Sequence, residues 1–522
     1  MSTHWNPPIE PSPREQKILS RSKAKKLYAF LRAHRHELFD EAFQQELSSM
    51  YGPQAPGGSE AVPPALLAMV TILQAAFHVS DADAVEEADN DRRWQMVLDC
   101  LDHDGAPFSQ GTLYNFRQRL IEHDMDRRLL DRTVELARKL GGFGHRNLRA
   151  AFDASPLFGA GRVEDTFNLI GHAAREVVRT AAQRLAVPVE QVAQRAGIPV
   201  LNASSIKAGL DINWDDPNAR TEALTELVRQ VDSLALWLAQ ELAESVEQPP
   251  LKEQLQTMRR LIAQDTEPDP GGLSKRRVRE GVAKERQISV RDPEMRHGRK
   301  SKSSRVDGYK RHLAIDLDLR LILGAAVTSA NRPEAEAMPE LLEALSNEQL
   351  VELLIDRGYL SAAEIETLRR NGVVVRCKPF PLRNRGRFTK ADFAVDLEAR
   401  TATCPNGIVV GIEPGRTVHF PPHSCDPCPL RASCTTTRLG TGRSLTIHTQ
   451  EAFHQDLRAA HSDPAARRAL RERTHVEHSL AHLGQSQGRR GRYLGRRKNL
   501  FDVRRHAAVA NLHTAARLLK AA

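Results

Sequence analysis

Cysteine is scarce in this 522-residue sequence, and that scarcity excludes a fold held together by disulfides. Six cysteines are too few for a disulfide framework in a chain of this length. Four of the six nevertheless fall between positions 404 and 434. Clustered thiols favour metal binding over disulfides, so this segment is a candidate metal site.

Long apolar runs are also missing. No uninterrupted run approaches the roughly 18 residues needed to cross a bilayer. The segment from Met1 to Pro8 lacks the apolar core of a signal peptide. We therefore expect a cytoplasmic protein with no membrane partner.

Two common catalytic motifs are absent as well. The run from Gly298 to Ser301 has no upstream glycine at the spacing of a phosphate-binding loop, so it predicts no nucleotide hydrolysis. His478 and His482 lie one helical turn apart but outside a His-Glu-x-x-His pattern, which argues against a zinc protease.

The composition is otherwise that of a globular protein, with 40% hydrophobic and 27% charged residues. The length suggests two to four domains. Lysine and arginine outnumber aspartate and glutamate by 75 to 66, which gives a net charge of +9. This excess fits a polyanionic partner without requiring one.

Three acids from distant parts of the sequence could together bind a divalent metal ion. Asp153 lies in a short apolar run, 147–155, that predicts a buried strand, and Asp356 follows a second apolar run. Glu477 lies in a helical pattern. Carboxylates hold Mg²⁺ or Mn²⁺, and two such ions stabilise the attacking and leaving oxygens of a phosphodiester reaction. Each acid alone is better explained as a solvated or ion-paired surface residue; together they are a candidate metal site.

The segments between these acids predict a mixed α/β sheet with a helical insertion. Two adjacent strand patterns, 309–317 and 321–328, predict a hairpin, and helices and strands alternate from 333 to 377. Much of 160–270 reads as helical, with no clear strand pattern, and carries one apolar stripe. A separate helical domain is the alternative for this region.

Two regions favour contact with DNA. Ser80 and Ser109 are predicted N-caps, and Ser109 precedes a helix over 111–121 whose exposed face would carry Arg117 and Arg119. Such a helix suits the major groove, although a plain helical bundle with a solvated face is the alternative. Eight Arg or Lys lie between 488 and 505, opposed by one acid, Asp502, as expected for phosphate contacts.

The cysteine cluster predicts one structural Zn²⁺. Cys425 and Cys428 have the spacing of a zinc knuckle, and Cys404 and Cys434 would complete four ligands. His423 is an alternative fourth ligand, and free thiols are the alternative to a zinc site.

Several of these stretches resemble the DDE transposases of bacterial insertion sequences. The resemblance rests on Phe152-Asp153, the Gly308–His312 motif, the Asn331–Glu334 motif, the Ile355–Tyr359 motif, Val476-Glu477 and the later stretch Arg492–Lys498. Residues 63–122 resemble the helical N-terminal domain of the same elements. Arg473 and Glu477 fit a Tyr, Arg, Glu, Lys signature, while Leu470 and Gly484 stand at its other two positions and Lys498 is a substitute lysine.

The resemblance implies a ribonuclease-H-like fold. We expect a helical N-terminal DNA-binding domain over 1–140 and a catalytic domain over 145–522. The catalytic domain would contain a helical insertion, 160–300, and a small zinc-ribbon-like insertion, 390–450.

The resemblance also implies a nucleoid-associated DNA transposase, acting as a homodimer on double-stranded terminal repeats and target DNA. Asp153, Asp356 and Glu477 would hold two Mg²⁺ ions for cleavage and strand transfer. The alternatives are a non-catalytic regulator derived from a transposase and a sequence-independent metal nuclease. The expected DNA contacts are Arg117, Arg119, Arg473, Arg492, Arg496, Arg497 and Lys498.

Overall fold

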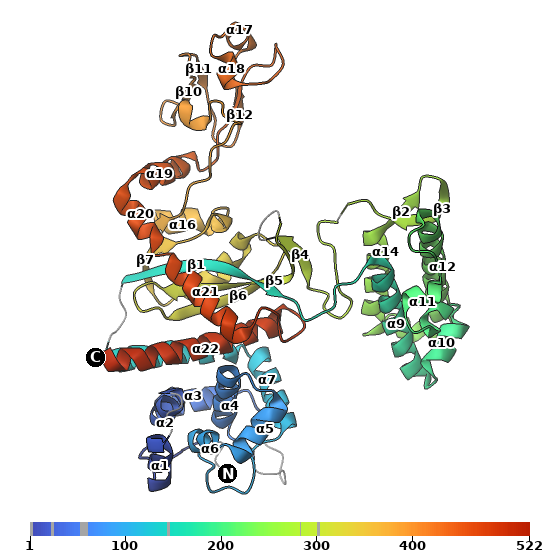
Figure 1. Ribbon diagram of the computed structural model, residues 1–522, viewed down its shortest axis with the longest axis vertical. Helices are drawn as coiled ribbons and strands as arrows, with labels where there is room; N and C mark the ends of the chain where they lie inside the picture. Colours follow the sequence, from blue (N-terminus) through green and yellow to red (C-terminus); the bar gives the residue numbers. More distant parts are fainter. Residues whose placement is uncertain are drawn as a thin grey trace.

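The structure is a computed structural model that describes residues 4–21, 26–52, 61–142, 147–281, 283–299 and 303–521. A mixed sheet lies at its centre, with the N-terminal helices below it in Figure 1. Two smaller units project from the sheet. A helix-rich unit lies to the right, and the unit that contains the clustered cysteines lies at the top.

In the described residues the central sheet has six strands, with β1 (Asn147–Phe158) in its middle. β1 pairs antiparallel with β5 (Arg305–Asp316) and parallel with β7 (Gln349–Leu354). β4 (Arg296–Arg299) and β6 (Ile322–Ser329) pair with successive parts of β5, and β8 (Val374–Arg376) pairs with β7. The predicted hairpin and mixed sheet are confirmed. Because β1, β7 and β8 run parallel, their C-terminal ends meet at one edge.

Helices cover the sheet and connect its strands. α21 (Thr474–Gln487) contacts β1 and β5, and α22 (Arg496–Ala521) contacts β6. The connections contain η2 (Glu334–Ala337), α15 (Met338–Glu343), η3 (Arg357–Tyr359) and α16 (Glu364–Arg370).

The N-terminal region is helical. Its helices are α1 (Pro13–Arg21), α2 (Lys26–Leu38), α3 (Glu41–Ser48), α4 (Pro64–Phe77), α5 (Asp81–Asn90), α6 (Arg92–Leu98), α7 (Gln110–Glu122) and α8 (Met125–Gly141). Both predicted N-caps are confirmed: Ser80 accepts a hydrogen bond from the N–H of Asp83, and Ser109 from that of Thr112. These caps satisfy amides that the first helical turn leaves unpaired.

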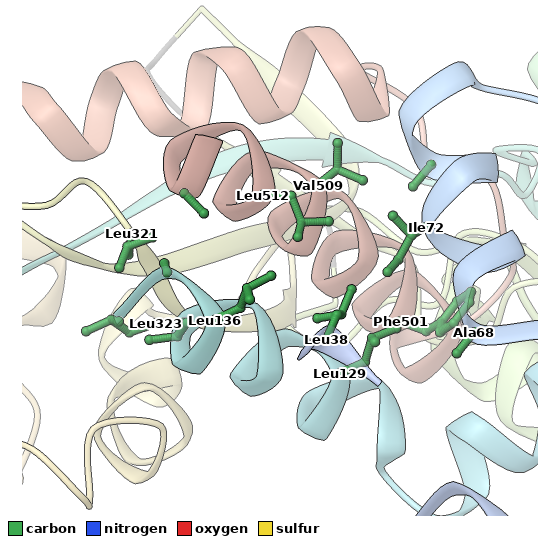
Figure 2. Packing of buried hydrophobic residues seen from close by; sticks show 14 of the residues in the cluster. Leu38, Ala68, Ile72, Leu129, Leu136, Leu321, Leu323, Phe501, Val509 and Leu512 are labelled. Carbon is green, nitrogen blue, oxygen red and sulfur yellow. The ribbon is translucent and has the colours of Figure 1, made fainter. Parts of the chain in front are cut away.

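The N-terminal helices share one hydrophobic core with the sheet. Figure 2 shows α22 between them, with Phe501 near Ala68 of α4 and Leu136 of α8 near Leu323 of β6. Leu512 of α22 is fully buried in the same cluster. The predicted boundary at 140–145 lies partly outside the described residues, since 143–146 are not described.

The helix-rich unit has its own core. It contains α9 (Thr166–Leu185), α10 (Val189–Arg195), α11 (Ile206–Leu210), α12 (Pro217–Glu241), α13 (Ala243–Val246) and α14 (Leu251–Asp265). The predicted stripe is confirmed: Leu224, Leu227, Val231, Leu234 and Leu238 are all buried in its core. The expectation that no strand interrupts 160–270 is wrong, because β2 (Thr266–Asp269) pairs with β3 (Gly272–Val278). These strands are short and largely polar, so they lack the alternating apolar pattern that marks a strand.

The cysteine unit is built from short strands. β9 (Ala394–Asp396), β10 (Thr401–Thr403) and β11 (Val409–Gly411) form one sheet, and β12 (Thr417–His419) pairs with β13 (Ser444–Thr446). Two single-turn helices follow β12, α17 (Pro422–Cys425) and α18 (Arg431–Cys434). The unit rejoins the sheet through α19 (Glu451–Ser462) and α20 (Pro464–Arg471).

Among the described helices, no single one is both long and apolar enough to span a membrane. α4 and α5 pass the length and composition test only as a pair, and they are bent by 102° relative to each other.

Candidate functional site

Asp153, Asp356 and Glu477 come together at the C-terminal edge of the parallel strands. Asp153 lies within β1, and Asp356 lies two residues beyond the end of β7. Glu477 lies in the first turn of α21, which packs against β1. The charges of Asp356 and Glu477 both raise the pKa of Asp153, which places both carboxylates within electrostatic range of Asp153.

Arg473 joins two of these acids. Its Nη1 donates to Asp153 Oδ2 at 2.8 Å, and its Nη2 donates to Glu477 Oε1 at 2.5 Å. The Arg473 and Asp153 side chains are only 14% and 13% exposed, so this ion pair is largely shielded from water. A cation therefore already lies between two predicted metal ligands.

Asp153 is held in an environment that disfavours its charge. Burial raises the pKa of Asp153 to about 6, Arg473 opposes the rise, and Asp356 and Glu477 add to it. Asp153 Oδ1 also accepts the N–H of Ala154 at 2.8 Å. Perturbed acids of this kind are common in functional sites.

In the parts of the chain that the structure describes, no group of three or more His, Cys, Asp or Glu side chains is arranged to hold a metal ion. For the three acids, Arg473 gives a physical reason. Its guanidinium lies between Asp153 and Glu477 and compensates their charges.

A fourth acid, Glu334, lies near Asp356 and Arg473. Burial raises the pKa of Glu334, Lys310 opposes the rise, and the charge of Asp356 adds to it. Lys310 Nζ lies 3.7 Å from Glu334 Oε1. A Cβ at Gly358 would lie 2.1 Å from Glu334 Oε2, so a larger residue at that position would push the Glu334 side chain aside. Glu334 belongs to the Asn331–Glu334 motif, but the motif alone does not predict that Glu334 lies near Asp356.

A buried hydrogen-bonded chain supports the edge that carries Asp356. Tyr359 Oη lies 2.8 Å from His312 Nδ1, and His312 Nε2 lies 2.8 Å from Thr328 Oγ1. Burial lowers the pKa of His312 to about 3 and raises that of Tyr359 well above its usual value. Both groups therefore stay neutral and fix the turn that follows Asp356.

Family comparisons identify two regions of the chain. Residues 281–512 match a transposase DDE domain, and residues 19–119 match a transposase domain (DUF772). The chain belongs to the DDE transposases of insertion sequences. No curated protein and no solved structure gave a significant match.

The family implies a ribonuclease-H-like fold, with which the mixed sheet of this transposase agrees. Asp356 and Glu477 lie within the DDE match, whereas Asp153 precedes it. The helix-rich unit separates β1 from the other strands in the sequence, which explains why the matched region begins after it.

The transposase has an arginine, Arg311, at the place where the signature lysine is missing. A Cβ at Gly484 would lie 2.6 Å from Arg311 Nη2. Arg311 donates to Ser155 Oγ and to Gln487 Oε1, both at 2.8 Å, and so ties α21 to β1. A lysine at position 484 would clash with this guanidinium and repel its charge.

Most of the arginines expected to contact DNA have protein partners in the structure. Arg117 makes two hydrogen bonds of 2.8 Å to Asp81, and Arg119 stacks over the Tyr51 ring at 4.5 Å. The other partners are Val79 O for Arg492, Glu294 for Arg496, and Asp124 and Asp126 for Arg497. Lys498 is exposed.

The four clustered cysteines line one small cavity of about 30 Å³. Burial raises the pKa of Cys434, Arg443 opposes the rise, and Cys425, Cys404 and Cys428 add to it, so the four thiols lie near one another. His423 is not among the residues that line this cavity.

Proposed function

We propose that this transposase cleaves DNA at the ends of its element and joins the freed ends to target DNA. Asp153, Asp356 and Glu477 would hold the divalent metal. The observation that carries the proposal is the meeting of these acids, contributed by three distant parts of the chain, around Arg473.

The donor set fits Mg²⁺ or Mn²⁺, which bind carboxylate oxygens. Asp153 and Glu477 already accept hydrogen bonds from a cation, so both oxygens face a site of positive charge. When bound, two such ions would activate water and stabilise the leaving oxygen. On metal binding, the guanidinium of Arg473 would leave Asp153 and Glu477 and would be free to pair with a DNA phosphate.

The protonation of Asp153 and the charge of Lys310 both affect how the site would bind metal and DNA. Asp153 must lose its proton before it binds metal, and its raised pKa makes that step sensitive to pH near 6. Lys310, beside Glu334, places a positive charge near Asp356 that suits a phosphate oxygen. The intact acids favour an active enzyme over a regulator that has lost catalysis.

DNA recognition is divided between two regions in this proposal. α7 would read the element ends, with Arg117, Arg119 and the exposed residues Tyr114 and Asn115. Arg492, Arg496, Arg497 and Lys498 would hold phosphates. An element has two ends, and each end needs an active site, so the reaction calls for two copies of the chain.

The cysteine unit would be held together by one Zn²⁺. The four thiols are not arranged as a metal site in the described structure, but they line one cavity and are the ligand type of a structural zinc site. Only six buried apolar residues form the core of this unit in the described structure, which is little for independent stability.

The direct test uses duplex DNA that contains an end of the encoding element and its flank. With Mg²⁺ the protein should cleave at the element boundary, and with a chelator it should not. Metal-dependent cleavage without preference for the boundary would favour the nuclease. Specific binding with no cleavage would favour the regulator.

A further inference from the structure

A group of exposed cations without carboxylate partners borders the active site. Elsewhere many arginines are paired, as Arg117 is with Asp81 and Arg496 is with Glu294. In the described chain, by contrast, no carboxylate lies within the 4.0 Å ion-pair distance of six exposed side chains: Lys378, Arg383, Arg385, Arg467, Arg468 and Arg471. The first three follow β8, and the last three lie on α20.

Of these six cations, Arg467 lines a groove of about 310 Å³, here called the basic groove. One wall is formed by residues 372–377, and the other by residues of α19 and α20 that include Arg467 and Leu470. Lys378 directly follows the first wall. The acid that lines the groove, Asp456, is paired with Arg369 at 3.1 Å and does not compensate the six cations.

The basic groove lies next to the three acids. Burial raises the pKa of Cys377, in the groove wall, to about 12, and the charges of Asp356 and Arg473 also act on this thiol. Arg357 Nε, one residue after Asp356, donates to Lys378 O at 3.4 Å. On the other side, α20 ends two residues before Arg473. Both walls therefore begin at the active site.

Lys378, Arg467, Arg468 and Arg471 place like charges on the two sides of the groove, and Asp463 at the start of α20 offsets part of the charge of Arg467 and Arg468. A surface of one sign around a groove attracts a polyanion. Duplex DNA carries one charge per about 1.7 Å of its axis, so it can neutralise cations on both walls together. Guanidinium groups also bind phosphate with two hydrogen bonds.

We propose that the basic groove binds the phosphate backbone of duplex DNA beside the scissile bond, without reading its sequence. The proposal rests on the proposed function, because it takes DNA as the substrate. It gives a DNA-binding role to two further segments, α20 and the segment that connects β8 to the cysteine unit. The helices at the two ends of the chain keep the roles proposed above.

Two triple variants test the proposal: Lys378→Gln with Arg383→Gln and Arg385→Gln, and Arg467→Gln with Arg468→Gln and Arg471→Gln. Glutamine removes the charge and retains helix propensity in α20. The matched control removes three exposed cations elsewhere, Lys17→Gln with Arg220→Gln and Arg259→Gln. Thermal unfolding of all three proteins shows that they remain folded.

Binding to random duplex DNA across a salt series gives the main readout. At low salt, each groove variant should bind DNA at least about tenfold more weakly than the wild type does. The slope of log affinity against log salt should decrease in magnitude by about 2–3. The control should bind as the wild type does. The proposal would be overturned by groove variants that bind DNA and respond to salt as the control does. It would also be overturned by groove variants that bind DNA normally but no longer bind an acidic protein.

Two comparisons show whether the groove binds flanking DNA or target DNA. Weaker binding to an element end with a long flank, but not to one trimmed at the boundary, assigns the groove to flanking DNA. Normal cleavage with reduced joining assigns it to target DNA. A wild type that never cleaves would overturn the proposed function yet leave the salt experiment valid, so the two failures are distinct.

Discussion

Arg473 links two acids that must separate from it when metal binds. Replacing it with Gln should lower the melting temperature without metal, because Asp153 and Glu477 would face each other without a cation. Mg²⁺ should then raise the melting temperature of R473Q more than that of the wild type, since no guanidinium competes with the ion. Thermal unfolding against Mg²⁺ concentration measures both effects.

Arg471→Gln is the control for this change, because Arg471 is exposed and lies two residues away without a carboxylate partner. Equal Mg²⁺ responses in R473Q, R471Q and the wild type would show that Arg473 does not compete with metal.

The pKa of Asp153 predicts a pH effect on stability. Its folded value of about 6 lies above the usual value of 3.8, so folding favours the protonated acid. That contribution is present below about pH 4 and is lost as pH rises through about 6. Asp153→Asn has no proton to lose and therefore avoids this loss of stability. The difference between the folded and the usual pKa corresponds to a free energy on the order of 3 kcal/mol.

Without metal, D153N should therefore melt at the same temperature as the wild type near pH 3.5 and at a higher temperature near pH 7.5. The melting temperatures of both proteins across this range check the prediction. A constant difference across the range would mean that the environment of Asp153 does not oppose its charge.

Single residues also show what the sequence could predict. The acids were found because each follows or lies in a recognisable pattern, and a family resemblance joined them. Arg311 was missed because its role depends on Gly484, which is 173 positions away in the chain and close only in the folded protein. Glu334 was present in a quoted motif, but its approach to Asp356 comes from the pairing of β5 with β6 and of β1 with β7.

Among the helices, α7 offers a clear test of end recognition. Asn115 is exposed on α7, whereas Arg117 is held by Asp81. Asn115→Ala should weaken binding to the element end by about 1–3 kcal/mol and leave random DNA unchanged, because base contacts discriminate and phosphate contacts do not. Gln191→Ala, an exposed amide of the helix-rich unit, is the control. Equal losses on both DNAs would rule out α7 as a reader of sequence.

Arg117→Ala should lower the melting temperature in addition to weakening binding to the element end. It leaves the half-buried carboxylate of Asp81 without its partner, which costs about 1–3 kcal/mol. A stable R117A that loses only end binding would instead mean that Arg117 leaves Asp81 to contact a base.

The cysteine unit gives a test by metal analysis. Purified protein should contain about one zinc per chain, and Cys425→Ser with Cys428→Ser should lose it and unfold residues 400–440 locally. Cys100→Ala, which changes a buried thiol of the N-terminal region, should keep the zinc. Local unfolding is measured by hydrogen exchange. A wild type that is folded, active and free of zinc would contradict the assignment.

At the scale of the whole molecule, the strands and helices were easier to predict than the way they pack against one another. Apolar runs and caps predicted the hairpin, the α7 N-cap and the apolar stripe of α12. They did not predict that α22 would pack between the N-terminal helices and the sheet. That packing joins the two ends of the chain, and periodicity shows an apolar face without showing what covers it.

The central claim is that Asp153, Asp356 and Glu477 form one metal-dependent active site. Metal-dependent cleavage of element-end DNA by Asp153→Asn, Asp356→Asn and Glu477→Gln tests it most directly, with Asp215→Asn, an exposed acid of the helix-rich unit, as control. Each of the three should reduce cleavage by more than about a hundredfold and leave end binding within about twofold, because each removes a metal ligand and no basic contact. Cleavage at the wild-type rate by any one of them would remove that residue from the site and contradict the account.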